Sequence, residues 1–253
     1  MARRPRDTVN SSLTLSPEVQ NIADVMGSSI STRDLIILAS IEQMIDTGPV
    51  DFNSGTVCDL LNLKHPMINY YFGSRDGLIA EATIWAYRGW SNKAISATRN
   101  APKDPEKRLR AYLGAGLEWA GNMHSMTLLS QYPVLSQAVK TIVDEGYSIE
   151  LQKNFEFHIV FLAALIIDLR KGKASDLDFD ETNYPKAQYM LTHPKELLDA
   201  ASVAWAGHGV NLWNSGSHIP TRNLRQEFTA KVSDRLAVSV HMDNIIAIAR
   251  GRK

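Results

Sequence analysis

The stretch Asn69–Ile79, NYYFGSRDGLI, is the most informative part of this sequence. Its first half continues a short helix that His65-Pro66 opens, because proline is favoured in the first turn of a helix. Tyr71 and Phe72 are expected in the core, and the helical pattern breaks at Gly73. The pattern therefore predicts a short helix with aromatic residues near its end, followed by a sharp change of chain direction.

Two further helices are predicted before this stretch. Ser31–Asp34 combines an N-cap residue with an acid three positions on, and the apolar face that follows ends at Gly48. Asn53 is the predicted N-cap of a second, short helix that ends at Asn62, a residue type that tolerates the left-handed conformation. Two short helices joined by a tight turn and braced by a longer one match helix-turn-helix geometry, in which the second short helix enters the major groove.

The segment Thr32–Glu81 resembles the DNA-binding head of TetR-family transcriptional regulators. Asn69–Ile79 is similar to the family's junction between the recognition helix and a connecting helix, which here would run from Ser74 to about Asn100. The sequence departs from the family pattern at four places. Asn62 stands for the usual turn glycine, Cys58 for alanine, Lys64 for a serine or threonine cap, and Arg75 for lysine. Operator preference therefore does not transfer from the family.

The residue types in this segment suggest how it would contact DNA. Lys64, Tyr70 and Arg75 can donate to phosphate oxygens, which positions a protein without reading sequence. Side chains near the start of the second short helix can reach base edges, and Asn69 could pair with adenine. The predicted DNA-binding residues are Asn53, Lys64, His65, Met67, Asn69, Tyr70 and Arg75.

Charge gives this prediction little support. The 253-residue chain has 27 basic and 27 acidic side chains, whereas nucleic-acid-binding domains usually carry a basic excess. Between residues 33 and 75 acidic residues outnumber Arg33, Lys64 and Arg75. We therefore keep open the alternative of a helical ligand-binding or protein-interaction module that does not bind DNA.

The rest of the chain predicts an all-α fold. Apolar residues recur at helical spacing, and no period-2 run bounded by turn signals is present. Pro102, Pro133, Gly172, Pro185 and Pro194 are among the breaks. Three regions are expected: 1–30, an arm with a short helix that starts at Ser16-Pro17; 31–80, the DNA-binding domain; and 81–253, a helical effector-binding and dimerisation domain.

Other classes of protein lack their sequence signatures here. The single cysteine, Cys58, argues against a disulfide framework, and the longest apolar run, Ile159–Ile167, is too short to cross a membrane. Glu-x-x-His, His-Glu-x-x-His, Gly-x-Ser-x-Gly and phosphate-loop motifs are absent. We expect a cytoplasmic, nucleoid-associated protein that is not an enzyme and that needs no metal or cofactor.

The TetR resemblance also implies a homodimer, a palindromic operator and an effector pocket in the body. Aromatic and methionine side chains at helical spacing suggest a largely apolar ligand, although such stripes are also common in plain cores. The predicted lining is Trp85, Trp119, Met123, Met126, Tyr132, Phe155, His158, Phe161 and Leu162. Small and aromatic residues that would suit helix contact across a two-fold axis are Ala201, Ala204, Trp205, Gly207, His208, Leu212 and Trp213.

Overall fold

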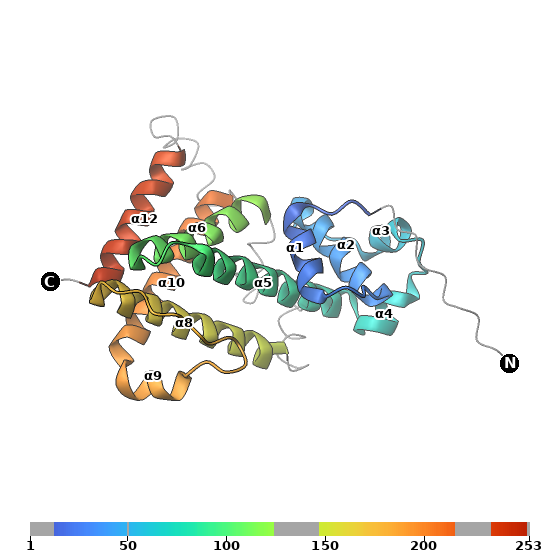
Figure 1. The fold of residues 1–253 in the computed structure, drawn as a ribbon. Coiled ribbons are helices and arrows are strands. Elements are labelled where there is room, and N and C mark those ends of the chain that lie inside the picture. The colour runs from blue at the N-terminus through green and yellow to red at the C-terminus, as the bar shows by residue number, and fades with distance from the viewer. Residues whose placement is uncertain (1–12, 50, 124–146, 216–233, 252–253) are drawn as a thin grey trace.

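The computed structural model describes residues 13–49, 51–123, 147–215 and 234–251, and these residues form ten helices and no strand. The all-α fold class predicted from the sequence is confirmed (Figure 1).

Helix α1 (Pro17–Met26) and helix α2 (Thr32–Thr47) begin and end where local signals place them. Pro17 opens α1, and Gly27, with φ 107°, follows it. Ser31 accepts a hydrogen bond from the Asp34 backbone N–H while the Asp34 carboxylate accepts one from Ser31 N, so both halves of a capping box form.

Helices α3 (Ser54–Leu60) and α4 (Pro66–Phe72) are the two short helices predicted from the sequence. The Asn53 side chain caps α3 by accepting a hydrogen bond from Gly55 N at 2.9 Å. Gly73, with φ 72°, ends α4, and Ser74 then caps α5 (Arg75–Asn100). The long helix after the break therefore begins and ends where it was expected.

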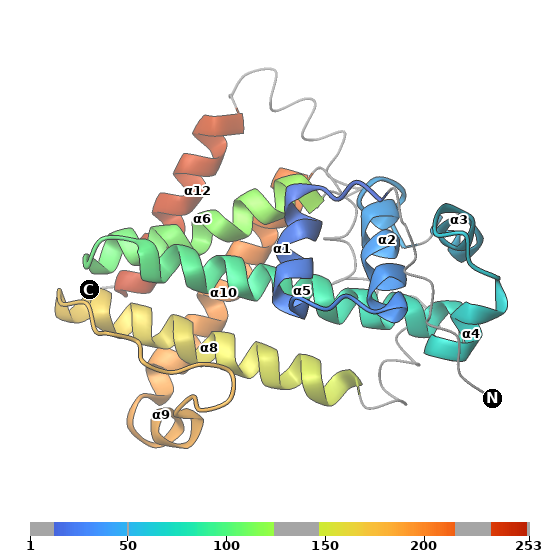
Figure 2. The same cartoon turned by 45° about the vertical axis from the view of Figure 1, so that its right-hand side comes forward.

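Helix α5 runs along the molecule and joins its two ends (Figures 1 and 2). At 1.5 Å per residue, its 26 residues span about 39 Å. Helices α6 (Pro105–Met123) and α8 (Tyr147–Lys171) pack against it. Helix α10 (Pro194–Ser215) packs on α6 and α8, and α12 (Asp234–Arg250) packs on α10, α6 and α8. Helix α9 (Lys186–Thr192) packs on α8 and α10.

The apolar side chains form two clusters that meet along α5. The N-terminal cluster unites α1 to α4 with the first half of α5, and it also includes Trp119 and Met123 of α6. The second cluster unites α6, α8, α10 and α12 with the second half of α5, and Trp90 packs against both clusters. The N-terminal core thus extends past residue 80, into α5 and α6.

Helix α1 packs against the N-terminal cluster and makes polar contacts with α5 and α6. Asn21 Nδ2 donates to the Gly89 carbonyl at 3.0 Å, and the Glu18 carboxylate contacts Lys93 and Asn122. Val19 and Ile22 are fully buried. These contacts fasten the N-terminal helix to α5 and α6.

Candidate nucleic-acid interface

The turn between α3 and α4 depends on one residue in the left-handed region. Asn62 has φ 52°, and the Leu63 N–H beyond it donates to the Cys58 carbonyl at 2.8 Å, as in a left-handed helix end. Cys58 is fully buried. Burial raises the pKa of its thiol, with a further contribution from Asp59, so the unreactive thiol form is favoured.

Helix α4 has one buried and one exposed face. Ile68 and Phe72 are buried and Tyr71 is half-buried, whereas Tyr70 is 78% exposed. Figure 1 shows α4 at the end of the molecule far from α8 to α12. A short helix held by its apolar face and projecting at one end is accessible to a large partner.

The predicted DNA-contacting side chains gather on this exposed face and in the turn before it. Lys64, His65 and Asn69 are exposed, Met67 is half-buried, and Asn53 is exposed at the start of α3. His65 does not cap α4, since its backbone is already helical, and its Nε2 lies 3.6 Å from Asp59. Six of the seven predicted residues are thus exposed or half-buried at α4, in the turn before it or at the start of α3, and Tyr70 is the most exposed large hydrophobic side chain among them.

Arg75, the seventh predicted residue, has partners inside the protein. Its guanidinium donates to the carbonyls of Phe52 and Pro49 at 2.8–3.1 Å and lies 5.6 Å from the centre of the Phe52 ring. These bonds tie the loop between α2 and α3 to the start of α5. Arg75 thus holds the loop that precedes the exposed surface.

A second arginine, Arg33, contacts the end of α4. Arg33 of α2 forms an ion pair with Glu81 of α5 at 2.5 Å, and its guanidinium carbon lies 5.1 Å from the centre of the Phe72 ring. Three helices are therefore joined by one side chain, which helps to hold α4 in a defined orientation.

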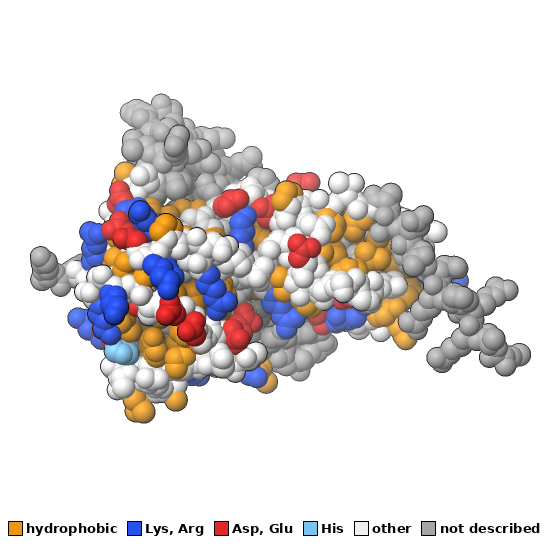
Figure 3. Space-filling view, viewed as in Figure 1, with side chains coloured by type: hydrophobic (Ala, Val, Ile, Leu, Met, Phe, Trp, Pro, Cys, Tyr) orange, Lys and Arg blue, Asp and Glu red, His pale blue; other side chains and the backbone are white. Residues whose placement is uncertain are grey.

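The charge around this surface is sparse. Lys64 lies next to His65, which is 3.6 Å from the exposed carboxylate of Asp59. On the face that Figure 3 shows, hydrophobic and neutral side chains dominate the α1–α4 end, while positive and negative side chains alternate over the opposite end. Any DNA contact here would depend on shape and hydrogen bonding more than on a basic field.

The described side chains among those predicted to line an effector pocket are divided between the two clusters. Trp85, Trp119 and Met123 belong to or border the N-terminal cluster, whereas Phe161 and Leu162 lie in the second cluster. Phe155 is 51% exposed, and Met126 and Tyr132 lie outside the described residues.

His158, the remaining predicted pocket residue, is buried in a chain of hydrogen bonds. The Glu181 carboxylate can only accept, so Ser91 Oγ donates to it (2.8 Å), His158 Nε2 donates to Ser91 Oγ (2.8 Å), and Tyr112 OH donates to His158 Nδ1 (2.8 Å). Burial lowers the pKa of His158 from 6.5 to about 3, which keeps the ring neutral. Trp90 packs on the ring at 4.3 Å between centres.

A cavity of about 180 Å³ lies at the outer end of this chain, between α5, α8 and the segment that links α8 to α9. Sequence reasoning missed it, because Glu181 comes from a segment without helical periodicity and meets Ser91 from 90 positions away. The cavity is lined by Ile84, Tyr87, Arg88, Lys153, Asn154, Glu181 and Thr182.

The predicted dimer residues of α10 point in different directions. Ala201 and Trp205 are exposed, Trp205 by 78%, and Leu198 one turn earlier is 71% exposed. Gly207 instead faces Leu113 of α6, and Ala204 packs against the second cluster. The side chains of His208, Leu212 and Trp213 lie outside the described residues.

Comparisons with known proteins include a likeness to a solved structure. No protein-family model matches the chain, and no curated protein sequence matches it either. A solved structure described as "the putative transcriptional regulator from Pseudomonas aeruginosa PAO1" is similar with a TM-score of 0.54 and 18% identity, over 87% of this chain and 90% of that one. At this identity the likeness supports the all-helical fold. Separately, none of the described helices has the length and apolar character needed to span a bilayer.

Proposed function

We propose that this protein is a DNA-binding transcriptional regulator of the TetR type, with α3 and α4 as its helix-turn-helix and residues 31–80 as its DNA-binding domain. The observation that carries the proposal is the exposed face of α4, where polar and aromatic side chains project from a helix whose opposite face is core. The similarity of fold to a solved structure described as a transcriptional regulator adds support.

The proposed contacts follow from position and chemistry. Lys64 and Tyr70 donate to phosphate oxygens, while His65, Met67 and Asn69 reach base edges from the start of α4. Arg75 acts chiefly through the loop it holds. With few cations in each head, we expect a shallow dependence of affinity on salt concentration.

The test is a selection of bound duplexes from a random library, followed by fluorescence anisotropy with the enriched sequence. Lys64→Ala is expected to weaken binding about threefold to tenfold, and Tyr70→Phe, which removes only the hydroxyl, by a similar factor, since each phosphate contact contributes on the order of 1 kcal/mol. Lys173→Ala changes an exposed lysine between α8 and α9 and should leave affinity unchanged.

A different result would favour the second candidate. The exposed carboxylate of Asp59, 3.6 Å from His65 at the start of α4, would suit a basic protein partner better than DNA. If no duplex is enriched, or if Lys64→Ala and Tyr70→Phe bind as tightly as the parent, the exposed face of α4 is better assigned to protein interaction. A non-enzymatic role belongs to both candidates.

We further propose that residues 81–253 form an effector-binding and dimerisation domain. The exposed Leu198, Ala201 and Trp205 line one side of α10, whose other side packs on α6 and α8, and an exposed apolar stripe of this kind suits a two-fold interface. A homodimer would place two α4 helices about 34 Å apart on a palindromic operator in the cytoplasm, at the nucleoid.

An effector would act through α5, which carries residues of the α4 junction at one end and borders the cavity further along. Ligand binding that favours one position of α5 would change the spacing of the two α4 helices and release the operator, as in a repressor. The sequence predicts a largely apolar effector. The cavity that borders α5 is lined by charged as well as apolar side chains, so an effector bound there would need polar groups as well.

A further inference from the structure

Helix α1 packs against three helices, α2, α5 and α6 (Figure 2). On one side, the Ser16 N–H that precedes it donates to the Glu42 carboxylate of α2 at 2.9 Å, and Val19 is fully buried in the N-terminal cluster. On the other side, its polar contacts reach α5 and the last turns of α6. Helix α1 therefore touches a helix that precedes α3 and α4 as well as two helices that extend to the other end of the molecule.

The polar contacts of α1 with α5 and α6 include a buried carboxylate. Glu18 is 6% exposed, and its Oε1 accepts a hydrogen bond from Asn122 Nδ2 of α6 at 2.6 Å and lies 3.4 Å from Lys93 Nζ of α5. Lys93 also pairs with Glu118 of α6 at 3.1 Å. A buried carboxylate that loses its partners is costly, so Glu18 favours one position of α1 on these two helices.

Apolar packing favours the same position of α1. A Cβ at Gly89 of α5 would lie 2.5 Å from Ile22 of α1 and 2.7 Å from Trp119 of α6, so these two side chains meet over the bare backbone of Gly89. Asn21 Nδ2 also donates to the Gly89 carbonyl at 3.0 Å. Close packing of this kind resists displacement, because van der Waals contacts are lost over a fraction of an ångström.

Helix α5 connects the two apolar clusters, but a single long helix defines an orientation poorly because it can bend. Helix α1 adds a second connection, since it joins α2 to α6 as well as to α5. Trp119 and Met123 extend this connection by placing the end of α6 inside the N-terminal cluster. A tilt of α2 relative to α6 must therefore disturb the contacts of α1.

We propose that α1 is a brace that fixes the orientation of α2, α3 and α4 relative to α6, with Glu18 as its main positioning residue. This orientation does not rest on the proposed function. Its consequence for operator choice does. In a dimer bound to DNA, the orientation of the two α4 helices sets the distance between half-sites, so the brace makes the protein select operators of one spacing.

The first experiment measures distances within the full-length protein without DNA. Nitroxide labels are attached at Asp46→Cys in α2 and Lys107→Cys in α6, both exposed positions, in a Cys58→Ala background so that only the introduced cysteines react. Double electron-electron resonance with an excess of unlabelled protein then reports the distances within one chain. We expect a single narrow distribution in this parent, because α1 holds the two labelled helices in one arrangement.

Variants of α1 test the brace. Glu18→Lys places a second ammonium group beside Lys93 and should broaden the distance distribution about twofold, because further orientations become populated. Asp24→Lys makes the corresponding exchange on the exposed side of α1 and should leave the distribution unchanged. Glu18→Gln keeps the shape of the side chain and should broaden the distribution by a smaller factor. It decides the question if circular dichroism shows that Glu18→Lys is unfolded.

The second experiment uses the duplex enriched in the selection. Inserting two base pairs between its half-sites should weaken binding of the parent at least about tenfold, because the second α4 no longer meets its half-site. In Glu18→Lys the same insertion should weaken binding less than about threefold, since α4 can take more than one position. The variant's affinity for a single half-site should equal that of the parent, because α4 itself is unaltered.

Three results would overturn the brace: a broad distribution in the parent, an unchanged distribution in both Glu18 variants, or equal broadening in Asp24→Lys. Broadening in Glu18→Lys of a protein that enriches no duplex would support the brace and contradict the proposed regulator. Enrichment of a duplex together with unchanged distances would do the reverse. If the distances broaden but the insertion weakens the parent and Glu18→Lys equally, α1 does not select the operator spacing.

Discussion

Asn62 shows how a single backbone angle shapes the surface that α4 presents. Its φ of 52° lets the chain turn into α4 within a few residues of the end of α3 at Leu60. A residue with a branched Cβ would be strained there, whereas glycine would not. The left-handed conformation is therefore a requirement of the turn itself.

Substitutions at Asn62 should consequently follow backbone tolerance. We expect Asn62→Gly to change the free energy of unfolding by less than about 0.5 kcal/mol, and Asn62→Val to reduce it by about 1–2 kcal/mol. Urea denaturation measures both. Asn69→Val on the exposed face of α4 is the control, because asparagine and valine have similar helix propensities. Equal losses in the two valine variants would contradict this account.

His158 predicts a particular dependence of stability on pH. Burial lowers the pKa of its imidazole to about 3, so between that value and the unfolded value of 6.5 the unfolded chain binds the additional proton. The histidine's contribution is complete above pH 6.5 and declines as the pH falls below it. From pH 7.5 to pH 5.0 the loss amounts to about 2 kcal/mol, given an unfolded pKa of 6.5.

The measurement compares the parent with His158→Gln, which can keep hydrogen bonds to Tyr112 and Ser91. Subtracting the two pH profiles removes the contribution of carboxylates that titrate in both proteins. We expect the parent to lose about 2 kcal/mol more than the variant over this interval. Parallel profiles would mean that the imidazole is protonated in the folded state and that the assigned direction of its hydrogen bonds is wrong.

The helices themselves were largely predictable because their ends depend on neighbouring residues. The Ser31 capping box, the Asn53 cap and the glycines after α1 and α4 act within a few positions of each helix end. The contact between Glu181 and Ser91 spans 90 positions and depends on how helices pack, so no local pattern could reveal it. For the same reason the sequence could not show that Trp119 and Phe161 lie in different clusters.

The close contact between α1 and α5 requires glycine at position 89 of α5. A Cβ at Gly89 would lie 2.5 Å from Ile22 Cγ1 and 2.7 Å from Trp119, so the two helices approach at a distance that alanine does not permit. Gly114 in α6 is the matched control, since a Cβ there would have no neighbour within 4 Å. Both glycines lie within helices, but the space for a side chain is filled at Gly89 and open at Gly114.

The same substitution should therefore have opposite signs at these positions. Gly89→Ala is expected to lower the free energy of unfolding by about 1–3 kcal/mol through overpacking. Gly114→Ala should raise it by about 0.5–1 kcal/mol, the gain in helix propensity. Denaturant titration gives both values. If Gly89→Ala stabilises the protein as Gly114→Ala does, α1 does not pack on α5 as described.

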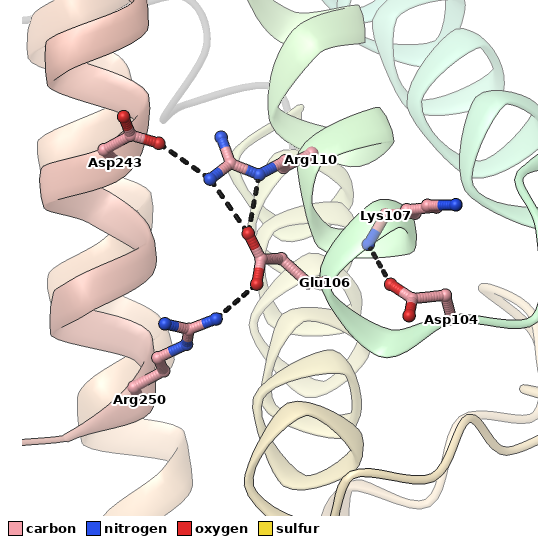
Figure 4. A network of polar contacts seen from close by, with 6 residues as sticks. All are labelled: Asp104, Glu106, Lys107, Arg110, Asp243 and Arg250. Atoms are coloured by element: carbon pink, nitrogen blue, oxygen red, sulfur yellow. Dashed lines mark hydrogen bonds and ion pairs between the residues drawn. The ribbon is translucent and has the colours of Figure 1, made fainter.

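The whole molecule is held together by α5 and by polar contacts between distant parts of the chain. Figure 4 shows Glu106 and Arg110 of α6 bound to Arg250 and Asp243 of α12. Arg110 donates to Asp243 at 2.7 Å and to Glu106 at 2.9 Å. Because these side chains are partly or largely exposed, each pair contributes on the order of 0.2–1 kcal/mol. The buried Ile245, Ile246 and Ala249 of α12, which belong to the second cluster, are therefore expected to contribute more to its attachment.

Trp205 offers a way to test whether two copies of the protein associate through α10. An exposed tryptophan between Ala201 and the end of α10 suits the centre of an interface between two copies, since aromatic side chains dominate such surfaces. We expect the parent to sediment as a dimer and Trp205→Glu to sediment as a monomer, because two carboxylates would meet near the two-fold axis without compensation.

Leu191→Glu is the matched control, as Leu191 of α9 is 84% exposed and lies outside the proposed stripe on α10. It should remain dimeric and keep its affinity for the enriched duplex. Trp205→Glu should lose most of its affinity for a palindromic site while keeping weak binding to a half-site, because α4 is unaltered and only the second contact is lost. Dimeric Trp205→Glu, or equal dissociation by Leu191→Glu, would place the interface elsewhere in the molecule.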